Sequence, residues 1–201
     1  MPTVSPTSGH ALGFADAVTA SQSVFRALLA AMAEPGRIVT LDGLPQPPAG
    51  ISPAAAAVLL ALADYETPLW LMTPDAAVEA YLRFETGARI VMEPALAAFA
   101  LVSRAADLAT LDVFAQGEPE YPDRSTTLVM EVARLDEAGS GGGLLLSGPG
   151  IKSTTRLDAG PLPADFKAMM AGNRQRFPLG VDIVLAAGDR IACLPRSLTV
   201  A

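Results

Sequence analysis

The sequence predicts an α/β fold in which helices pack on the faces of a β-sheet. Apolar runs of strand length alternate with stretches whose apolar residues recur at helical spacing, and this alternation is typical of such folds. Proline and glycine separate the runs. Of the 201 residues, 51% are hydrophobic and only 17% are charged, so the chain either fills a large core or keeps apolar surface for partners.

The first part of the chain predicts a tail followed by a helix. Residues 1–12 are rich in Pro, Ser and Thr, and we expect a flexible N-terminal tail there. No internal repeat or long linker divides residues 13–201, which we expect to form a single α/β domain. A helix is predicted from Asp16 to Ala33, because apolar residues recur at helical spacing until Pro35-Gly36 ends the run. Those apolar residues are Val18, Phe25, Leu28, Leu29 and Met32.

A second helix is predicted from Pro53 to Ala63, after a short strand over 38–41 and a proline-rich loop. Ser52 is suited to cap this helix, and Pro53 to occupy its first position. The segment is apolar nearly all round, so we expect it to be buried.

The remaining helices are predicted from apolar residues at helical spacing, and the remaining strands from short apolar or alternating runs. Helices are predicted over 75–84, 108–114 and 163–176, and a loop over 117–124. Strands are predicted over 68–72, 88–92, 99–103, 126–135, 144–146 and 151–157, with a final hairpin of 181–186 and 191–194 around Gly188-Asp189.

Side chains that commonly perform catalysis are scarce. The chain has one histidine (His10, in the predicted tail), one cysteine (Cys193) and two lysines (Lys152 and Lys167). Zinc sites need several Cys, His or carboxylate ligands, and the sole histidine leaves no partner for a serine nucleophile, so we expect no metal site, no cofactor and no catalytic residue. The sequence indicates part of a larger assembly rather than a self-sufficient enzyme.

Charge and hydropathy exclude two classes of partner. The net charge of −7 argues against nucleic acid, which requires a basic face. The longest apolar run, residues 54–63, is half the length of about 20 residues that spans a bilayer. No charged start precedes an apolar block at the N-terminus, so we expect a soluble, cytoplasmic protein.

Two hydroxyl- or glycine-rich segments are candidates for anion binding. Arginine beside a run of hydroxyls can hold a phosphate or phosphonate, and backbone N–H groups of glycine turns can do the same. Both patterns are also ordinary, as a strand start and a tight turn, so the alternatives remain open. The candidate residues are Arg124, Ser125, Thr126, Thr127, Ser147, Gly148 and Gly150.

Several stretches taken together resemble one family, the PhnH family of the bacterial phosphonate carbon–phosphorus lyase system. Their order and spacing cover the chain from about residue 13 to its end. They are Gly13-Phe14 with Asp16, Ser21-Gln22, Phe25-Arg26, Met32, Pro35-Gly36, Glu66-Thr67-Pro68, Trp70-Leu71, Thr86-Gly87-Ala88, Gly117-Glu118-Pro119, Ser125-Thr126-Thr127, Ser147-Gly148-Pro149-Gly150-Ile151, Asn173, Phe177-Pro178-Leu179-Gly180-Val181-Asp182 and Leu194-Pro195-Arg196.

The resemblance implies a mixed β-sheet flanked by helices, an α/β sandwich faintly like pyridoxal-phosphate-dependent transferases but without the cofactor site. It also implies a homodimer that joins subunits G, I and J in a core complex. That complex makes ribose 1-phosphonate 5-triphosphate from a nucleoside triphosphate and a phosphonate before the C–P bond is broken. In this family the chemistry is credited to subunits I and J, so the expected role of this chain is structural. The alternative is that the chain itself binds phosphonate or nucleotide through the candidate anion-binding residues.

Overall fold

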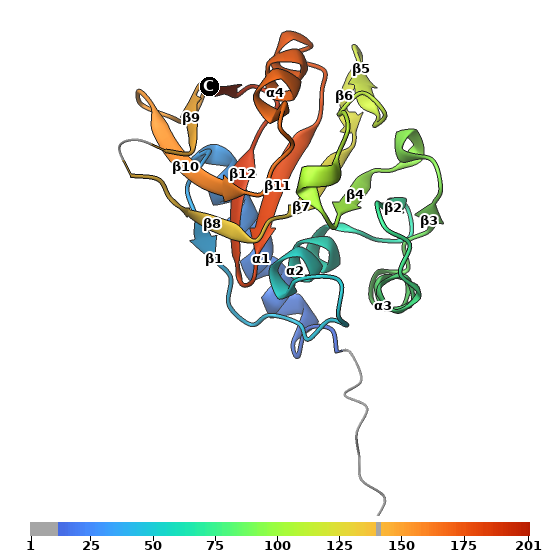
Figure 1. Ribbon diagram of the computed structural model, residues 1–201. Coiled ribbons are helices and arrows are strands. Elements are labelled where there is room, and N and C mark those ends of the chain that lie inside the picture. Colours follow the sequence, from blue (N-terminus) through green and yellow to red (C-terminus); the bar gives the residue numbers. More distant parts are fainter. Residues whose placement is uncertain (1–11, 140–141) are drawn as a thin grey trace, which may run out of the picture.

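A seven-stranded sheet forms the middle layer of the molecule (Figure 1), in a computed structural model that describes residues 12–139 and 142–201. In sheet order its strands are β1 (Val39–Thr40), β12 (Arg190–Leu194), β11 (Asp182–Ala187), β7 (Thr127–Glu131), β4 (Phe99–Val102), β2 (Leu69–Leu71) and β3 (Ile90–Val91). The five strands from β11 to β3 are parallel, whereas β12 is antiparallel to both of its neighbours. The expected mixed sheet is confirmed.

Both faces of this sheet are covered, which explains why its strands are apolar at successive positions. On β7, Val129 faces one apolar cluster, while Leu128 and Met130 face the other. The same alternation holds on β11, where Val184 faces the first cluster and Ile183 and Leu185 the second. The sheet therefore lies between two cores.

Three helices cover the first face: α1 (Ala17–Ala33), α2 (Pro53–Leu62) and α3 (Ala76–Thr86). Helix α2 begins as predicted, because the Ser52 hydroxyl accepts the Ala55 N–H at 3.2 Å and Pro53 is its first residue. Residues 54–59 of α2 are fully buried, and the helix contacts α1, α3, β7 and β11. Its run of alanines permits this close packing from every side.

A second, four-stranded sheet and one helix cover the other face (Figure 1). The strands are β13 (Thr199–Val200), β9 (Leu144–Ser147), β10 (Thr155–Gly160) and β8 (Arg134–Glu137), and the helix is α4 (Phe166–Gln175). Ala201, after β13, exchanges backbone hydrogen bonds with Leu145 at 2.8 and 2.9 Å, so the last residue of the chain is part of this sheet.

Three predicted elements are wrong. The predicted loop over 117–124 is a hairpin of β5 (Gln116–Glu118) and β6 (Tyr121–Ser125). Residues 108–114, predicted as a helix, contain only bends and a turn, and the nearest helical segment is the 3-10 turn Ala105–Asp107 before them. The predicted strand over 126–135 is divided into β7 and β8. In the hairpin, Gly117 has φ +80°, and a Cβ there would lie 2.6 Å from the Pro122 carbonyl oxygen, so the two strands approach too closely for a side chain.

The predicted tail lies almost wholly outside the described residues, as do residues 140–141 of the glycine run. Leu12, the last residue of the predicted tail, forms a two-way backbone bridge with Gln46 at 2.9 Å. The extent of the tail and the division into one domain stay predictions. Within the described part of the chain, no helix is long and apolar enough to cross a membrane.

Helix α1 carries two apolar faces rather than the single one predicted. Val24, Leu28 and Ala31 face the core. Val18, Phe25 and Leu29 face outward, with exposed fractions of 70%, 46% and 54%. These three residues, seven and four positions apart, align along one side of the helix, and we call them the α1 stripe.

Cys193 reports on the integrity of the sheet. It lies fully buried on β12, and burial, together with the charge of Asp182, raises the pKa of its thiol to about 12. Because the thiolate is the reactive form, we expect iodoacetamide to label the native protein at least about 10³-fold more slowly than the unfolded chain, in line with a small unfolded fraction. Mass spectrometry counts the adduct, and one adduct per chain in guanidinium chloride is the internal control. Rapid labelling of the native protein contradicts this buried placement.

Candidate functional site

The first group of predicted anion-binding residues lies where the β5–β6 hairpin joins the main sheet. Arg124 is on β6, where its guanidinium stacks over the Tyr121 ring at 3.9 Å and lies 4.0 Å from the Glu118 carboxylate. Its side chain is largely exposed. Arg124 therefore faces solvent among its own hairpin neighbours.

The hydroxyls that follow Arg124 are used to attach the hairpin. The fully buried Thr126 hydroxyl donates to the Ala97 carbonyl oxygen at 2.6 Å and accepts the Ala115 N–H at 3.2 Å. The buried Ser125 hydroxyl accepts Nη2 of Arg196 at 2.5 Å. Thr127 begins β7 and is half-buried. In this conformation the contacts of Ser125 and Thr126 are structural.

The second group lies on another part of the molecule, in the turn after β9. Ser147 ends β9, and the Ile151 N–H closes the turn on the Gly148 carbonyl oxygen at 3.1 Å. Gly150 has φ +82°, and a Cβ there would lie 2.1 Å from the carbonyl oxygen of Ala33, at the end of α1. The glycine is therefore needed for close packing.

No hydrogen bond among the described residues joins these two groups. Gly150, at the end of this turn, instead lines a groove of about 270 Å³ together with Glu34, Arg37, Lys152 and Ser153. One cradle built from both groups stays a prediction.

Arg196 connects the segments that carry the family resemblance. Its guanidinium pairs with the Asp182 carboxylate through Nε and Nη2. The backbone N–H of Arg196 also donates to Asp182 Oδ1, at 2.8 Å. Nη1 donates to the carbonyl oxygens of Pro122 at 2.8 Å and Pro178 at 3.4 Å. Arg196 thus joins the hairpin, the turn before β11 and the chain after β12. We call this cluster the Arg196 hub.

Asn173 of α4 completes the hub from the other side of that turn. Its side-chain amide donates to the Val181 carbonyl oxygen and accepts the Val181 N–H, each at 2.9 Å. This contact requires a glycine at position 180, because a Cβ there would lie 2.6 Å from Asn173 Oδ1. The resembling stretches around 117–127, 173–182 and 194–196 therefore meet at the amino-terminal ends of β7 and β11.

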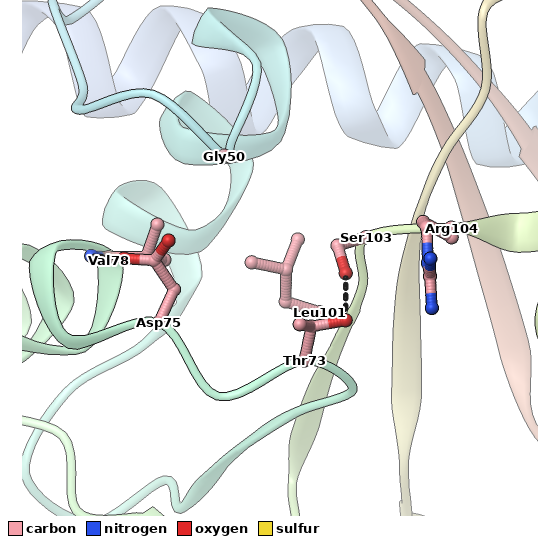
Figure 2. Close-up of a pocket in the computed structure, with 7 residues that line it drawn as sticks. All are labelled: Gly50, Thr73, Asp75, Val78, Leu101, Ser103 and Arg104. Carbon is pink, nitrogen blue, oxygen red and sulfur yellow. Dashed lines mark hydrogen bonds between the residues drawn. The ribbon is translucent and has the colours of Figure 1, made fainter.

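The opposite, carboxyl-terminal edge of the parallel strands is hollowed (Figure 2). Thr73 follows β2 and Ser103 follows β4, and the Ser103 hydroxyl donates to the Thr73 hydroxyl at 3.1 Å. A dashed line marks this bond in Figure 2. Asp75 caps α3 across the hollow, since its Oδ1 accepts the N–H groups of Ala77 and Val78 at 2.9 and 3.1 Å. Gly50 lines the far side. The hollow has a volume of about 300 Å³.

A second hollow of about 540 Å³ shares Ser103 and Arg104 with the first and also contains Glu131, the last residue of β7. The Ser52 N–H donates to Glu131 Oε1 at 2.6 Å. Burial raises the pKa of the Glu131 carboxyl, and the bonds from Ser52 partly offset that rise. We call the two hollows together the carboxyl-edge crevice.

Sequence reasoning missed the crevice, because its polar residues come from segments far apart in the chain. A usable signal exists: Thr73, Ser103 and Glu131 each lie at or just after the end of an apolar strand run, and parallel strands bring such ends to one edge. Among residues 12–139 and 142–201, no group of three or more His, Cys, Asp or Glu side chains is placed to hold a metal ion.

The Arg196 hub predicts a stability difference between two arginine substitutions. The Arg196 and Asp182 side chains are 13% and 22% exposed. Arg196→Lys removes the bidentate geometry and leaves Asp182 and Ser125 under-bonded, so we expect the free energy of unfolding to fall by about 2 kcal/mol in urea titration.

The matched control is Arg83→Lys, in an i,i+4 pair with Glu79 on α3 that is 55% and 35% exposed. Such a surface pair contributes little, so its unfolding free energy should change by less than about 0.5 kcal/mol. Equal changes in the two variants contradict a stabilising hub.

Comparisons with known proteins identify the family of this chain. The bacterial phosphonate metabolism protein family, PhnH, matches residues 12–201. A Rhizobium meliloti (strain 1021) protein named alpha-D-ribose 1-methylphosphonate 5-triphosphate synthase subunit PhnH is 41% identical over 186 residues, which is 92% of each chain. A Stutzerimonas stutzeri protein named putative C-P lyase subunit protein HtxG is 31% identical over 176 residues, 88% of this chain and 83% of that one. With its whole described sheet inside the matched range, the chain belongs to the PhnH family of bacterial phosphonate metabolism proteins.

Proposed function

We propose that the protein is a non-catalytic, structural subunit of a phosphonate carbon–phosphorus lyase core complex. The observation that carries this proposal is the 41% identity, over 92% of both chains, to a protein named as a subunit of a ribose 1-methylphosphonate 5-triphosphate synthase. The composition supports it, because a chain with one histidine, one cysteine and two lysines depends on partners for acid–base and nucleophilic chemistry. The expected partners are subunits G, I and J, in the cytoplasm.

The α1 stripe supports a homodimer as the form in which the chain enters that complex. Arg26 is the only charged residue of α1, so two copies of this helix can pack with little like-charge repulsion. Val18, Phe25 and Leu29 span three turns, and an isologous contact between two such helices buries each stripe against the other. We propose a second copy of this chain as the occupant of the α1 stripe.

The amino-terminal edge of the sheet supports contact with the other subunits. Tyr121 and Phe177 are half-exposed there, and the guanidiniums of Arg124 and Arg174 lie 3.9 and 5.5 Å from their ring centres. Arginine and aromatic side chains are enriched in interface hot spots. The Arg196 hub holds both segments in place.

Mass measurement tests the assembly. We expect the purified chain to have the mass of two copies, and co-expression with subunits G, I and J to give a larger complex that contains it. Phe25→Asp should reduce the isolated protein to a single copy, because a carboxylate in an apolar contact is costly to desolvate. Phe84→Asp, on the exposed side of α3, is the matched control and should leave the dimer intact. A complex that forms without this chain and keeps its full activity contradicts the structural role.

A second candidate function is the binding of phosphonate or phosphate in the groove beside the Ser147–Gly150 turn. The observation that favours it is the presence of Lys152 and Ser153 in that groove, beside Arg37 and its ion-pair partner Glu34. Calorimetric titration with methylphosphonate should then give a dissociation constant of millimolar or tighter, about −4 kcal/mol. Lys152→Gln should weaken the binding of methylphosphonate, while Lys167→Gln, on α4, should leave it unchanged. Absence of heat at millimolar ligand removes this candidate.

A further inference from the structure

The carboxyl-edge crevice lies at a topological switch point of the sheet. The connection from β2 to β3 runs through α3 on the helical face, whereas the connection from β4 to β7 passes over the other face through Leu108, Leu111 and Phe114. Since β2 and β4 are neighbours, their departing segments diverge and leave a crevice between them. Open α/β sheets bind ligands at such points.

The crevice offers hydroxyl and carboxylate groups to a ligand. In the Thr73–Ser103 pair, one hydroxyl donates to the other, which keeps its own hydrogen for a further acceptor. The Glu131 carboxylate has about four acceptor sites and gives one to Ser52, so it can accept ligand hydroxyls. In dinucleotide-binding α/β folds an Asp or Glu near the switch point accepts a ribose hydroxyl, and Glu131 offers the same kind of group here.

One cation lies where the two hollows meet. Arg104 lines both of them, and its Nε is 2.9 Å from Asp107, which is its sole ion pair within the described residues. Its two Nη groups can bind a tetrahedral oxyanion in bidentate fashion. The crevice is lined by three carboxyl groups and by this one guanidinium; the carboxyl groups are those of Asp75, Asp107 and Glu131. It therefore favours a ligand that is rich in hydroxyls and bears few negative charges.

We propose that the carboxyl-edge crevice binds a ribosyl ligand that bears one phosphate or phosphonate group, with Glu131 and the Thr73–Ser103 pair on the sugar hydroxyls and Arg104 on the oxyanion. The choice of sugar rests on the proposed function, whereas the place and polarity of the site rest on the crevice. The two hollows, of about 300 and 540 Å³, match the size of small-molecule sites. The site is distinct from the groove beside Gly150.

Calorimetry on the full-length protein, with ribose 5-phosphate as the probe, tests the site. We expect saturable binding, and we expect ribose alone, inorganic phosphate and methylphosphonate each to bind at least about tenfold more weakly, since each lacks half of the contacts. Absence of saturable binding by about 10 mM ribose 5-phosphate, about tenfold above a millimolar dissociation constant, overturns the proposal.

Two variants locate the binding. Arg104→Gln removes the cation from an exposed position, and Glu131→Gln keeps the oxygen that accepts the Ser52 N–H while it replaces the second oxygen by a donor. Each should weaken ribose 5-phosphate binding by about tenfold, whereas Arg83→Gln on α3 should leave it unchanged. Thermal unfolding checks that the variants are folded. Because Arg104 is exposed, its variant gives a result even if Glu131→Gln unfolds. Unchanged binding in Arg104→Gln overturns the proposal.

Assembly with the partner subunits separates this proposal from the proposed function. Arg104→Gln should still join the complex formed on co-expression with subunits G, I and J. Loss of assembly in this variant shows that the crevice is a subunit contact, which overturns the ligand proposal and leaves the structural role intact. Failure of the wild-type chain to join the complex contradicts the proposed function, whatever ribose 5-phosphate does.

Discussion

Burial of helix α2 against the central strands is the contact on which the rest of the structure depends. Residues 54–59 are fully buried between α1, α3 and the sheet, and each buried valine or leucine there contributes about 1.5–3 kcal/mol. The same helix fixes the carboxyl edge, because the N–H of its capping residue, Ser52, holds Glu131 at the end of β7. Packing in the first core and the shape of the crevice thus share one element.

Local signals made much of this fold predictable. Ser52 and Pro53 indicate where α2 starts, and Gly188-Asp189 indicates the β11–β12 hairpin, because both depend only on neighbouring residues. The β5–β6 hairpin was missed because its prolines argue against strands, and Arg196, about 70 residues further along, holds it in place. The crevice was missed for the same reason: Thr73, Ser103 and Glu131 meet only after the parallel strands have paired.

The two edges of the parallel strands have different characters. At the amino edge, Arg196, Asp182 and Ser125 satisfy one another, and little hydrogen-bonding capacity is left for a ligand. At the carboxyl edge, Arg104 and Glu131 each have one partner within the described part of the chain, and both line open volume. A rigid edge suits contact with other subunits, and an open edge suits a small molecule. The predicted anion-binding residues fall at the rigid edge and in the turn after β9, away from the open edge.

The order of the strands has a consequence for synthesis on the ribosome. Strand β11 lies between β7 and β12 in the middle of the large sheet, yet it consists of residues 182–187, and the final residue, Ala201, closes the small sheet on Leu145. Neither core can close before residues 182–187 have been synthesised, because β11 contributes to both. During synthesis the apolar faces of α2 and β7 therefore wait for β11 and need protection by chaperones.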